Sequence, residues 1–393
     1  MKSLKTTLAV VSLSLLVTAC STPHKLDKRV DAHNYTQVTL PMESSTQEAE
    51  PLRTWLGEDI SYLYSEDNHT TPIRVNGDQL NVLVLSGGGA KGSFGAGVIK
   101  GLHDSNTLPD YSIITGVSAG ALLAPFVFVG GEEIDRLEEV MLGLNDKMIL
   151  GKRNFLNTIF KDAFTDGEDL FSFIEQTYSD EMIEQVAQQH RNGRRLLIGT
   201  THFDSEQMVV WNLGEIAASE NPDKARLFHQ VLVASASIPG VFPPQFIDVE
   251  LNGQPLEEMH VDGGLSAQMF LQASNIDFKK INQALGLEKS PKIQVIRNGV
   301  LKMPYQQVKD KGMDLLTQSV KSLTLQQTRG DLYRMMYFSE VQDLELEFTY
   351  IDDRFTPQAQ SKQMFDSTYM KALYNYGYNK ATKHQLWTTD VPY

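Results

Sequence analysis

The sequence predicts an α/β fold with a largely parallel central sheet. From residue 80 onward, short apolar runs that end at glycine alternate with helical patterns, which is typical of parallel strands joined by helical crossovers. The first run covers residues 80–85 and stops at a glycine cluster, as a buried strand does. A helical pattern follows at residues 95–103, and a second β-rich run covers residues 111–115.

The same alternation continues towards the C-terminus. After small apolar residues at 119–129, helical patterns cover residues 169–189 and 222–236. Further strands are predicted at residues 195–199, 207–211, 259–261, 293–296 and 344–350. No repeat and no clean linker follows residue 80. We therefore predict one domain at residues 82–275 and an extension at residues 276–393 that completes the α/β body.

The charge of the chain excludes one class of partner. The 393 residues carry a formal net charge of −14, whereas nucleic-acid binding needs clustered lysine and arginine. We therefore expect no nucleic-acid partner. The same charge argues against attraction of the whole chain to anionic lipid headgroups, so contact with a membrane needs another source.

The first twenty residues supply such a source. Two lysines precede an apolar run at residues 8–17, which is too short to span a bilayer. Cys20, the only cysteine of the chain, follows small residues in a pattern that resembles a bacterial lipobox. The resemblance implies a signal peptide at residues 1–19, acylation of Cys20 and a place in the bacterial cell envelope, at the outer membrane if the host is Gram-negative. The alternative is an ordinary secretory signal with a chance cysteine.

Residues 20–80 are predicted to join the anchor to the body. Residues 21–50 are polar and lack periodicity, which indicates a tether. Residues 51–74 contain several apolar side chains, and we expect them to pack on the body outside its central sheet. With Cys20 lipidated, no cysteine remains for a disulfide, so the core must stabilise the fold.

A glycine-rich loop follows the first predicted strand. Gly87, Gly89 and Gly92 fit G-x-G-x-x-G between a strand and a helix, with Gly88 between them. Such glycines let backbone N–H groups approach a negative charge, which is either a pyrophosphate or an oxyanion. Asp110 lies at a tolerable distance for a ribose-binding acid, so a dinucleotide enzyme is a serious alternative. The lack of Gly-Lys-Ser/Thr excludes a P-loop.

Two further motifs also follow apolar strand-like runs. Gly116-Val117-Ser118-Ala119-Gly120 fits G-x-S-x-G, the nucleophile elbow, in which a serine projects from a sharp strand-to-helix turn. The sequence Asp262-Gly263-Gly264 follows residues 259–261 and, taken alone, reads as an ordinary turn. Because catalytic groups collect at the carboxyl ends of parallel strands, we expect the three motifs to share one edge of the sheet.

Taken together, the motifs resemble the patatin-like phospholipases. A block at residues 234–244 is similar to the family's A-S-x-x-x-P-x-x-F-P-P, and the resemblance covers about residues 82–275. It implies a three-layer α/β/α fold, Ser118 as nucleophile, Asp262 as general base, and an oxyanion hole around Gly87, Gly88 and Gly89. The motif also includes Lys91 and Gly92. Two departures leave substrate preference open: Ser86 stands where the family often has aspartate, and Lys91 where it often has arginine.

Histidine offers an alternative base, because Ser-His-Asp is the commoner hydrolase arrangement. His260 shares a strand face with Asp262, and His202 follows another strand, but in the simpler interpretation His260 is a packed or surface residue of its strand. The apolar stretch at residues 148–173 is either a lid that admits acyl chains or, more simply, buried core.

The preferred function is hydrolysis of acyl esters of lipids, with a lipid or related ester as substrate, the membrane as partner through the anchor, and no cofactor or metal. The alternatives are a nucleotide-binding oxidoreductase that uses residues 87–92 and a non-catalytic lipid-binding lipoprotein. For residues after 275 we expect no chemistry.

Overall fold

The structure is a computed structural model of the chain, and it describes residues 28–41, 50–58, 61–65, 67, 69–150, 168–271, 276–361, 363–384 and 386–392. The predicted leader and Cys20 lie outside these residues. The strands of the described part are β1 (Arg53–Trp55), β2 (Asn81–Leu85), β3 (Ile113–Val117), β4 (Arg195–His202), β5 (Gln207–Asn212), β6 (Gln245–Leu251), β7 (Gln254–Asp262), β8 (Lys292–Ile296) and β9 (Glu345–Thr349).

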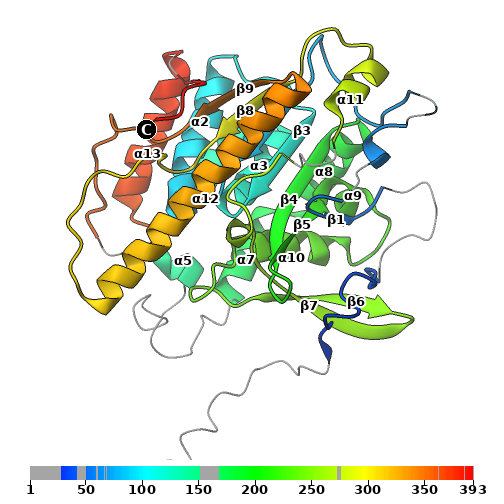
Figure 1. Cartoon of the computed structure of the whole chain (residues 1–393), viewed down its shortest axis with the longest axis horizontal. Coiled ribbons are helices and arrows are strands. Elements are labelled where there is room, and N and C mark those ends of the chain that lie inside the picture. Colours follow the sequence, from blue (N-terminus) through cyan, green and yellow to red (C-terminus); the bar gives the residue numbers. More distant parts are fainter. Residues whose placement is uncertain are drawn as a thin grey trace, which may run out of the picture.

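The helices of the same part surround the strands (Figure 1). They are α2 (Gly92–Asp104), α3 (Ala119–Val129), α4 (Glu132–Gly143), α5 (Asp146–Leu150), α7 (Glu168–Thr177), α8 (Asp180–Arg191), α9 (Leu213–Ala218), α10 (Lys224–Ala236), α11 (Phe278–Leu285), α12 (Gly312–Gln342) and α13 (Ser367–Thr382). Single 3₁₀ turns are η2 (Ser61–Leu63), η3 (Gly89–Lys91) and η4 (Gly263–Leu265). None of the helices in the described ranges combines the length and the apolar character needed to cross a bilayer.

One sheet carries all nine of these strands: seven follow the order β1-β5-β4-β3-β2-β8-β9, and β6 and β7 lie off this path. Strands β4, β3, β2, β8 and β9 run parallel, whereas β5 and β1 are antiparallel additions at one edge. β7 pairs antiparallel with the last residues of β4 and forms a hairpin with β6. The predicted α/β fold with a largely parallel sheet is confirmed.

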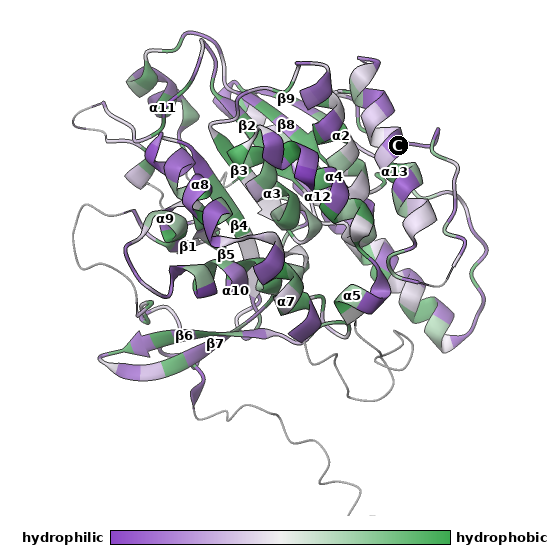
Figure 2. Cartoon of the chain, turned by 180° about the vertical axis from the view of Figure 1, so that it is seen from behind, coloured by the Kyte–Doolittle hydropathy of each residue, from purple (hydrophilic) through white to green (hydrophobic). Residues whose placement is uncertain are grey.

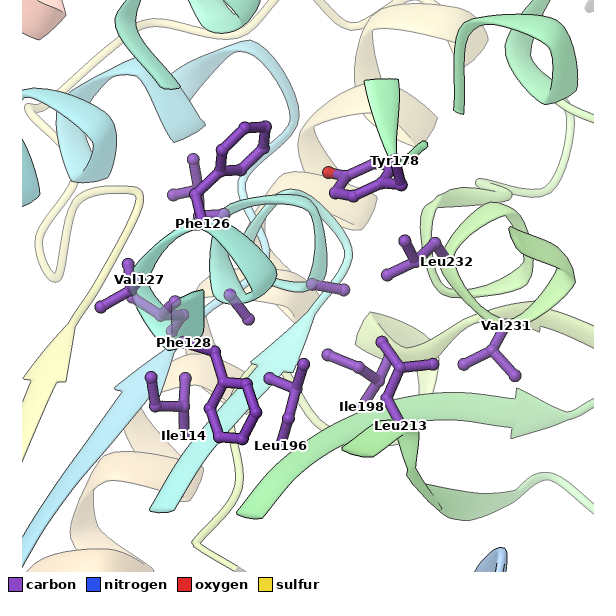
Figure 3. Close-up of a cluster of buried hydrophobic side chains, with 14 of the residues drawn as sticks. Ile114, Phe126, Val127, Phe128, Tyr178, Leu196, Ile198, Leu213, Val231 and Leu232 are labelled. Atoms are coloured by element: carbon purple, nitrogen blue, oxygen red, sulfur yellow. The ribbon is translucent and has the colours of Figure 1, made fainter. Parts of the chain in front are cut away.

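Helices cover both faces of the sheet, because alternate residues of each strand point to opposite sides. In β2, Leu83 and Leu85 pack with α2, α3, α4, α8, α10 and α13, and Figure 3 shows the part of this core between β3, β4, α3 and α10. Val82 and Val84 pack with α11 and α12 in a second core. In Figure 2 the strands are mostly green and the helices show both colours, as expected for half-buried helices around a buried sheet. The architecture has three layers.

The N-terminal segment is more ordered than predicted. Arg53–Trp55 form β1 and pair with β5, so the expectation that residues 51–74 stay outside the sheet was wrong for this strand. The tether prediction was wrong for residues 28–41, where Val38 and Leu40 are buried. These residues pack along the β6–β7 hairpin, with a bridge from Thr39 to Glu250. These contacts were not predicted because the segment is mostly polar, and its few apolar residues show no periodicity.

Two other differences are local. The single helical pattern at residues 169–189 is two helices, α7 and α8, because Ser179 caps α8 and accepts a hydrogen bond from the N–H of Met182. Strand β6 was not predicted, although Ile247, Val249 and Leu251 alternate with Asp248 and Glu250 in the period-2 pattern of a half-buried strand.

Candidate active site

Ser118 stands at the sharp turn between β3 and α3. Its backbone has φ 53° and ψ −123°, a region that residues with a side chain rarely occupy. The N–H of Ser118 donates to Ser235 Oγ (3.0 Å), and Ser235 Oγ donates to the carbonyl of Gly199 (2.7 Å). Because these groups are buried, their hydrogen bonds hold the turn against its backbone strain.

The glycines that flank Ser118 allow helix α3 to lie close to the sheet. Gly116 is within β3 and Gly120 is in the first turn of α3. A Cβ at Gly120 would lie 2.3 Å from the carbonyl oxygen of Leu85 at the end of β2, which is too close for any side chain. The motif therefore has the strand-turn-helix context of a nucleophile elbow.

Asp262 is the last residue of β7 and is only 4% exposed. Its Oδ1 accepts a hydrogen bond from the N–H of Gly264 (2.7 Å), and its own N–H donates to the carbonyl of Ser237 (3.0 Å). Burial raises the pKa of the Asp262 carboxyl to about 6, although hydrogen bonds from Ser118 and Gly264 act in the opposite direction. Gly263 and Gly264 begin the turn η4 that leads the chain away.

Strand β4 brings Ser118 and Asp262 together across 144 residues of sequence. β3 lies parallel to it, with Val117 opposite Gly199, and β7 lies antiparallel, with Asp262 opposite Thr200. The two side chains therefore project from neighbouring positions at one edge of the sheet. Ser118 Oγ donates to Asp262 Oδ2 at 2.6 Å, and both groups are buried.

The glycine loop reaches the same place from β2. β2 and β3 are parallel neighbours, so their carboxyl ends meet at one edge. A Cβ added at Gly87 would lie 3.2 Å from Ser118 Cβ, and Gly89 lines one pocket with Ser118. Gly92 begins α2, whose N-terminus thus faces this edge. All three predicted motifs are brought together.

The backbone N–H groups of this loop differ in their partners. Gly87 donates to the carbonyl of Gln268 (3.0 Å) and Lys91 donates to the carbonyl of Gly88 (3.2 Å). For the N–H groups of Gly88 and Gly89, no acceptor is found within the part of the chain that the structure describes. Among the residues of the predicted oxyanion hole, Gly88 and Gly89 therefore have backbone N–H groups that can donate to a substrate.

Arg297 and Asn298, which directly follow β8, support the glycine loop through hydrogen bonds. An Arg297 guanidinium N–H donates to the carbonyl of Gly87 (2.9 Å), and Asn298 Nδ2 donates to the carbonyl of Ser86 (2.8 Å). In a trans peptide the C=O and the following N–H point in opposite directions, so this contact turns the N–H of Gly88 away from Arg297. A Cβ at Gly88 would lie 2.2 Å from the carbonyl oxygen of Asn298.

This support corrects the expectation that no residue after 275 bears on the chemistry. Ser86 also differs from the family aspartate in a specific way: it is buried, its Oγ donates to the carbonyl of Gly87 (2.8 Å) and accepts from the N–H of Asn298 (2.8 Å). The sequence contained a signal for this support, because Arg297 and Asn298 directly follow the predicted strand at residues 293–296, as the catalytic motifs follow their strands.

Neither candidate histidine bonds to the serine–aspartate pair. His260 is fully buried, with one ring nitrogen 3.1 Å from Glu258 Oε2 and the other 3.0 Å from Thr200 Oγ1. His202 Nδ1 lies 2.8 Å from Ser205 Oγ, and the two rings contact each other edge to face. These are the contacts of packed strand residues.

Asp110 lies at the wrong end of the sheet for a dinucleotide. It precedes the five-residue strand β3, whereas the glycine loop follows the parallel strand β2, so about 16 Å of strand separates the two edges. Asp110 instead accepts from Asn76 Nδ2 (2.7 Å). In the dinucleotide alternative, Asp110 is therefore too far from the glycine loop to bind the ribose.

An apolar pocket of about 510 Å³, counting its open mouth, begins at Ser118. Besides Ser118 and Gly89, apolar side chains form its wall: Ala119, Leu122, Met141, Leu144, Ile149, Leu170, Phe173, Ala236, Ile238, Phe242, Met364 and Phe365. Such a wall suits a hydrocarbon chain whose polar end lies at the serine.

Part of the apolar stretch at residues 148–173 contributes to this wall. Ile149 and Leu170 are buried, as the core interpretation predicted, and they line the pocket together with Phe173. Residues 151–167 lie outside the described part of the chain, so the lid interpretation stays a prediction.

Two groups of possible metal ligands occur in the described ranges, and neither includes Ser118 or Asp262. The first is Glu50, His190 and Glu215. Within it, His190 Nε2 already lies 2.7 Å from Glu215 Oε2, and Glu50 forms an ion pair with Arg195. The second, His103, Asp104 and Asp135, is largely exposed and pairs with Lys100.

Comparison with known proteins gives distant relatives. The chain is 22% identical over 205 residues to the uncharacterised protein R571 of Acanthamoeba polyphaga mimivirus, covering 49% of this chain and 63% of that protein's length. Among solved structures, VipD of Legionella pneumophila matches with a TM-score of 0.38 and 12% identity over 78% of this chain and 67% of VipD. Full-length ExoU of Pseudomonas aeruginosa, solved with SpcU, matches with a TM-score of 0.26 and 15% identity over 51% of this chain and 47% of that chain.

A family comparison covers the residues that form the site. Residues 83–273 match the model of the patatin-like phospholipase family, a range that contains the glycine loop, the nucleophile elbow and Asp262. The chain therefore contains a patatin-like phospholipase domain at residues 83–273.

Proposed function

We propose that this chain is a membrane-anchored serine hydrolase that cleaves acyl esters of lipids with a Ser118–Asp262 dyad. One observation carries the proposal: Ser118 Oγ donates to Asp262 Oδ2 at 2.6 Å, at the start of an apolar pocket. A serine hydroxyl needs a neighbouring base to become a nucleophile, and a buried carboxylate with a raised pKa is a stronger base than an exposed one. The match of residues 83–273 to the patatin-like phospholipase model supports a lipid acyl hydrolase.

The proposed reaction has two halves. Asp262 takes the hydroxyl proton as Ser118 Oγ attacks the ester carbonyl, and the N–H groups of Gly88 and Gly89 donate to the oxyanion that forms. Collapse of this intermediate breaks the ester bond, and Asp262 passes its proton to the departing alcohol. Water then attacks the carbonyl of the acyl-serine as Asp262 accepts its proton, and Asp262 returns this proton to Ser118 Oγ as the fatty acid leaves.

The anchor is the second half of the proposal. We infer that Cys20 is acylated and that the protein is held by lipid in a bacterial envelope, at the outer membrane in a Gram-negative host. Support comes from the sequence: the short apolar run before Cys20 and its status as the only cysteine. Cys20→Ala is expected to abolish incorporation of labelled palmitate, and label retained in the variant would refute the assignment.

The catalytic proposal is tested by Ser118→Ala. The variant is expected to lose reaction with a fluorophosphonate probe and to lose release of fatty acid from lipid vesicles by about 10⁴-fold or more, while its circular dichroism is unchanged. Probe labelling that persists would move the nucleophile elsewhere. A wild-type protein that binds lipid but neither reacts with the probe nor releases fatty acid would favour the non-catalytic lipid-binding alternative.

A further inference from the structure

The first half of helix α12 leaves large apolar side chains in solvent. Leu316 is 57% exposed and Leu323 is 70% exposed, with Met313 and Val320 also exposed between and before them. The second half behaves differently, because Leu332 and Met335 are buried against the sheet. In Figure 1 the first half of α12 runs beyond the body, towards the end of the molecule that holds α5 and α7.

The exposed side chains form one stripe that leads to the active site. Met313, Leu316, Val320 and Leu323 are spaced by three, four and three residues, which places them on one side of a helix. Four residues further, on the same side, Gln327 Nε2 donates to the carbonyl of Leu265 (3.1 Å). Leu265 is itself exposed and lies three residues after Asp262.

The surroundings of the stripe are basic, although the chain is acidic. Residues 301–330 contain five lysines and arginines and two aspartates, a net charge of +3, whereas the whole chain carries −14. Burial and the charge of Arg297 lower the pKa of Lys91 in the glycine loop, and the charge of Lys321 adds to this effect. Tyr305, in the loop before α12, is 93% exposed, and tyrosine favours the boundary between membrane and water.

We propose that this surface, made of Tyr305, Leu265 and the stripe Met313, Leu316, Val320 and Leu323, docks on a bilayer that contains anionic lipid. Apolar side chains with flanking cations match the acyl and headgroup layers of such a bilayer, whereas a symmetric contact with the same surface of a second copy would bring like charges together. Docking here would bring the lipid surface to Leu265, three residues after Asp262 in the chain. The inference deepens the proposed function, but its first test does not depend on catalysis.

That test places an environment-sensitive fluorophore on the helix. In a full-length Cys20→Ala, Ser118→Ala background, which has no other thiol and cannot hydrolyse lipid, Leu323→Cys labels the stripe. Ser322→Cys, also exposed but on another side of the helix, is the matched control. With phosphatidylcholine vesicles containing one third phosphatidylglycerol, the label at 323 is expected to shift to the blue and that at 322 to stay unchanged. High salt or pure phosphatidylcholine should weaken the shift.

Equal shifts at both positions, or none at 323, would overturn the proposal. A shift at 323 that appears without vesicles as protein concentration rises would assign the surface to a second copy instead.

A second test measures turnover with Ser118 intact. The double variant Leu316→Asp, Leu323→Asp is expected to lose about tenfold or more of its rate on anionic vesicles, since removing one leucine from an apolar layer already shifts partition by about that factor. Its rate on a water-soluble short-chain ester should stay unchanged. Loss on both substrates would contradict docking, and a wild-type protein inactive on both would refute the proposed function while the fluorescence result still stood.

Discussion

The catalytic edge and the apolar pocket share Ser118 but are built in different ways. At the edge, buried hydrogen bonds hold each reacting group: Ser235 holds the turn of Ser118, Gly264 holds Asp262, and Arg297 holds the glycine loop. The pocket wall consists of apolar side chains from α3, α4, α5, α7, α10 and the loops that contain residues 144, 238–242 and 364–365, and these side chains contact one another by packing. The comparison teaches that directional bonds locate the chemistry, whereas packing sets which acyl chain reaches it, so the two regions should fail differently.

The largest effect is expected from the base. Asp262→Asn keeps the size of the side chain but cannot accept the proton of Ser118, and turnover should fall by about 10³-fold. In the wild type, Asp262 is protonated below its pKa of about 6 and cannot act as base, so the rate should rise with pH through that value and then level off. Initial rates on a soluble ester between pH 4.5 and 8.5 measure both.

A pKa near this value does not by itself separate aspartate from histidine, whose ordinary pKa is about 6.5. The separating controls are His260→Gln and His202→Gln, which are expected to keep substantial activity because neither ring bonds to the serine–aspartate pair. A folded histidine variant as inactive as Ser118→Ala would make Asp262 an orienting group in a triad.

The next effect tests the donors at the edge. Gly88→Ala should lower turnover by about 10²-fold with less change in KM, because the new Cβ would lie 2.2 Å from the carbonyl oxygen of Asn298 and must displace the loop. Gly89→Ala is the matched control, since a Cβ there meets no atom within 4 Å, although its φ of +55° adds some strain. Equal losses of turnover in the two variants would show that the close approach to Asn298 does not matter.

A substitution in the pocket wall should change the preference for acyl-chain length and leave turnover of short esters nearly unchanged. Ile149→Trp fills part of the wall, and we expect kcat/KM for a long-chain ester to fall about tenfold while an acetate ester changes by less than about twofold. Met148→Trp is the control, because Met148 is exposed and is not part of the pocket wall. A series of p-nitrophenyl esters measures the effect. Uniform loss at all chain lengths would contradict the division between edge and pocket.

The smallest effect concerns stability at the nucleophile turn. Since Ser118 has a φ of 53°, Ser118→Gly should relieve strain that Ser118→Ala retains, by about 1 kcal/mol, which raises Tm by roughly 2 °C. Both variants are inactive, so calorimetry compares the folds alone. A higher Tm for the alanine variant would mean that the hydrogen bonds around the turn, not glycine's freedom, decide its stability.

The sequence by itself located the three motifs and most of the sheet. The glycine loop, the elbow and Asp-Gly-Gly are short motifs whose conformations depend on neighbouring residues, and the apolar runs before them marked β2, β3 and the end of β7. Parallel strands place their carboxyl ends together, so the meeting of the glycine loop and Ser118 followed from the pattern, whereas Asp262 reaches Ser118 from β7, which is antiparallel to β4.

Tertiary structure alone decided which groups support and surround that chemistry. Arg297 reaches Gly87 across 210 residues, and the pocket wall combines α3 with a loop near residue 365, contacts that no local pattern encodes. Burial decided the raised pKa of Asp262 and the inert surroundings of His260, two residues apart on one strand. The sequence did not predict that the stripe of α12 is exposed, because an apolar helical face looks the same whether protein or solvent lies beyond it.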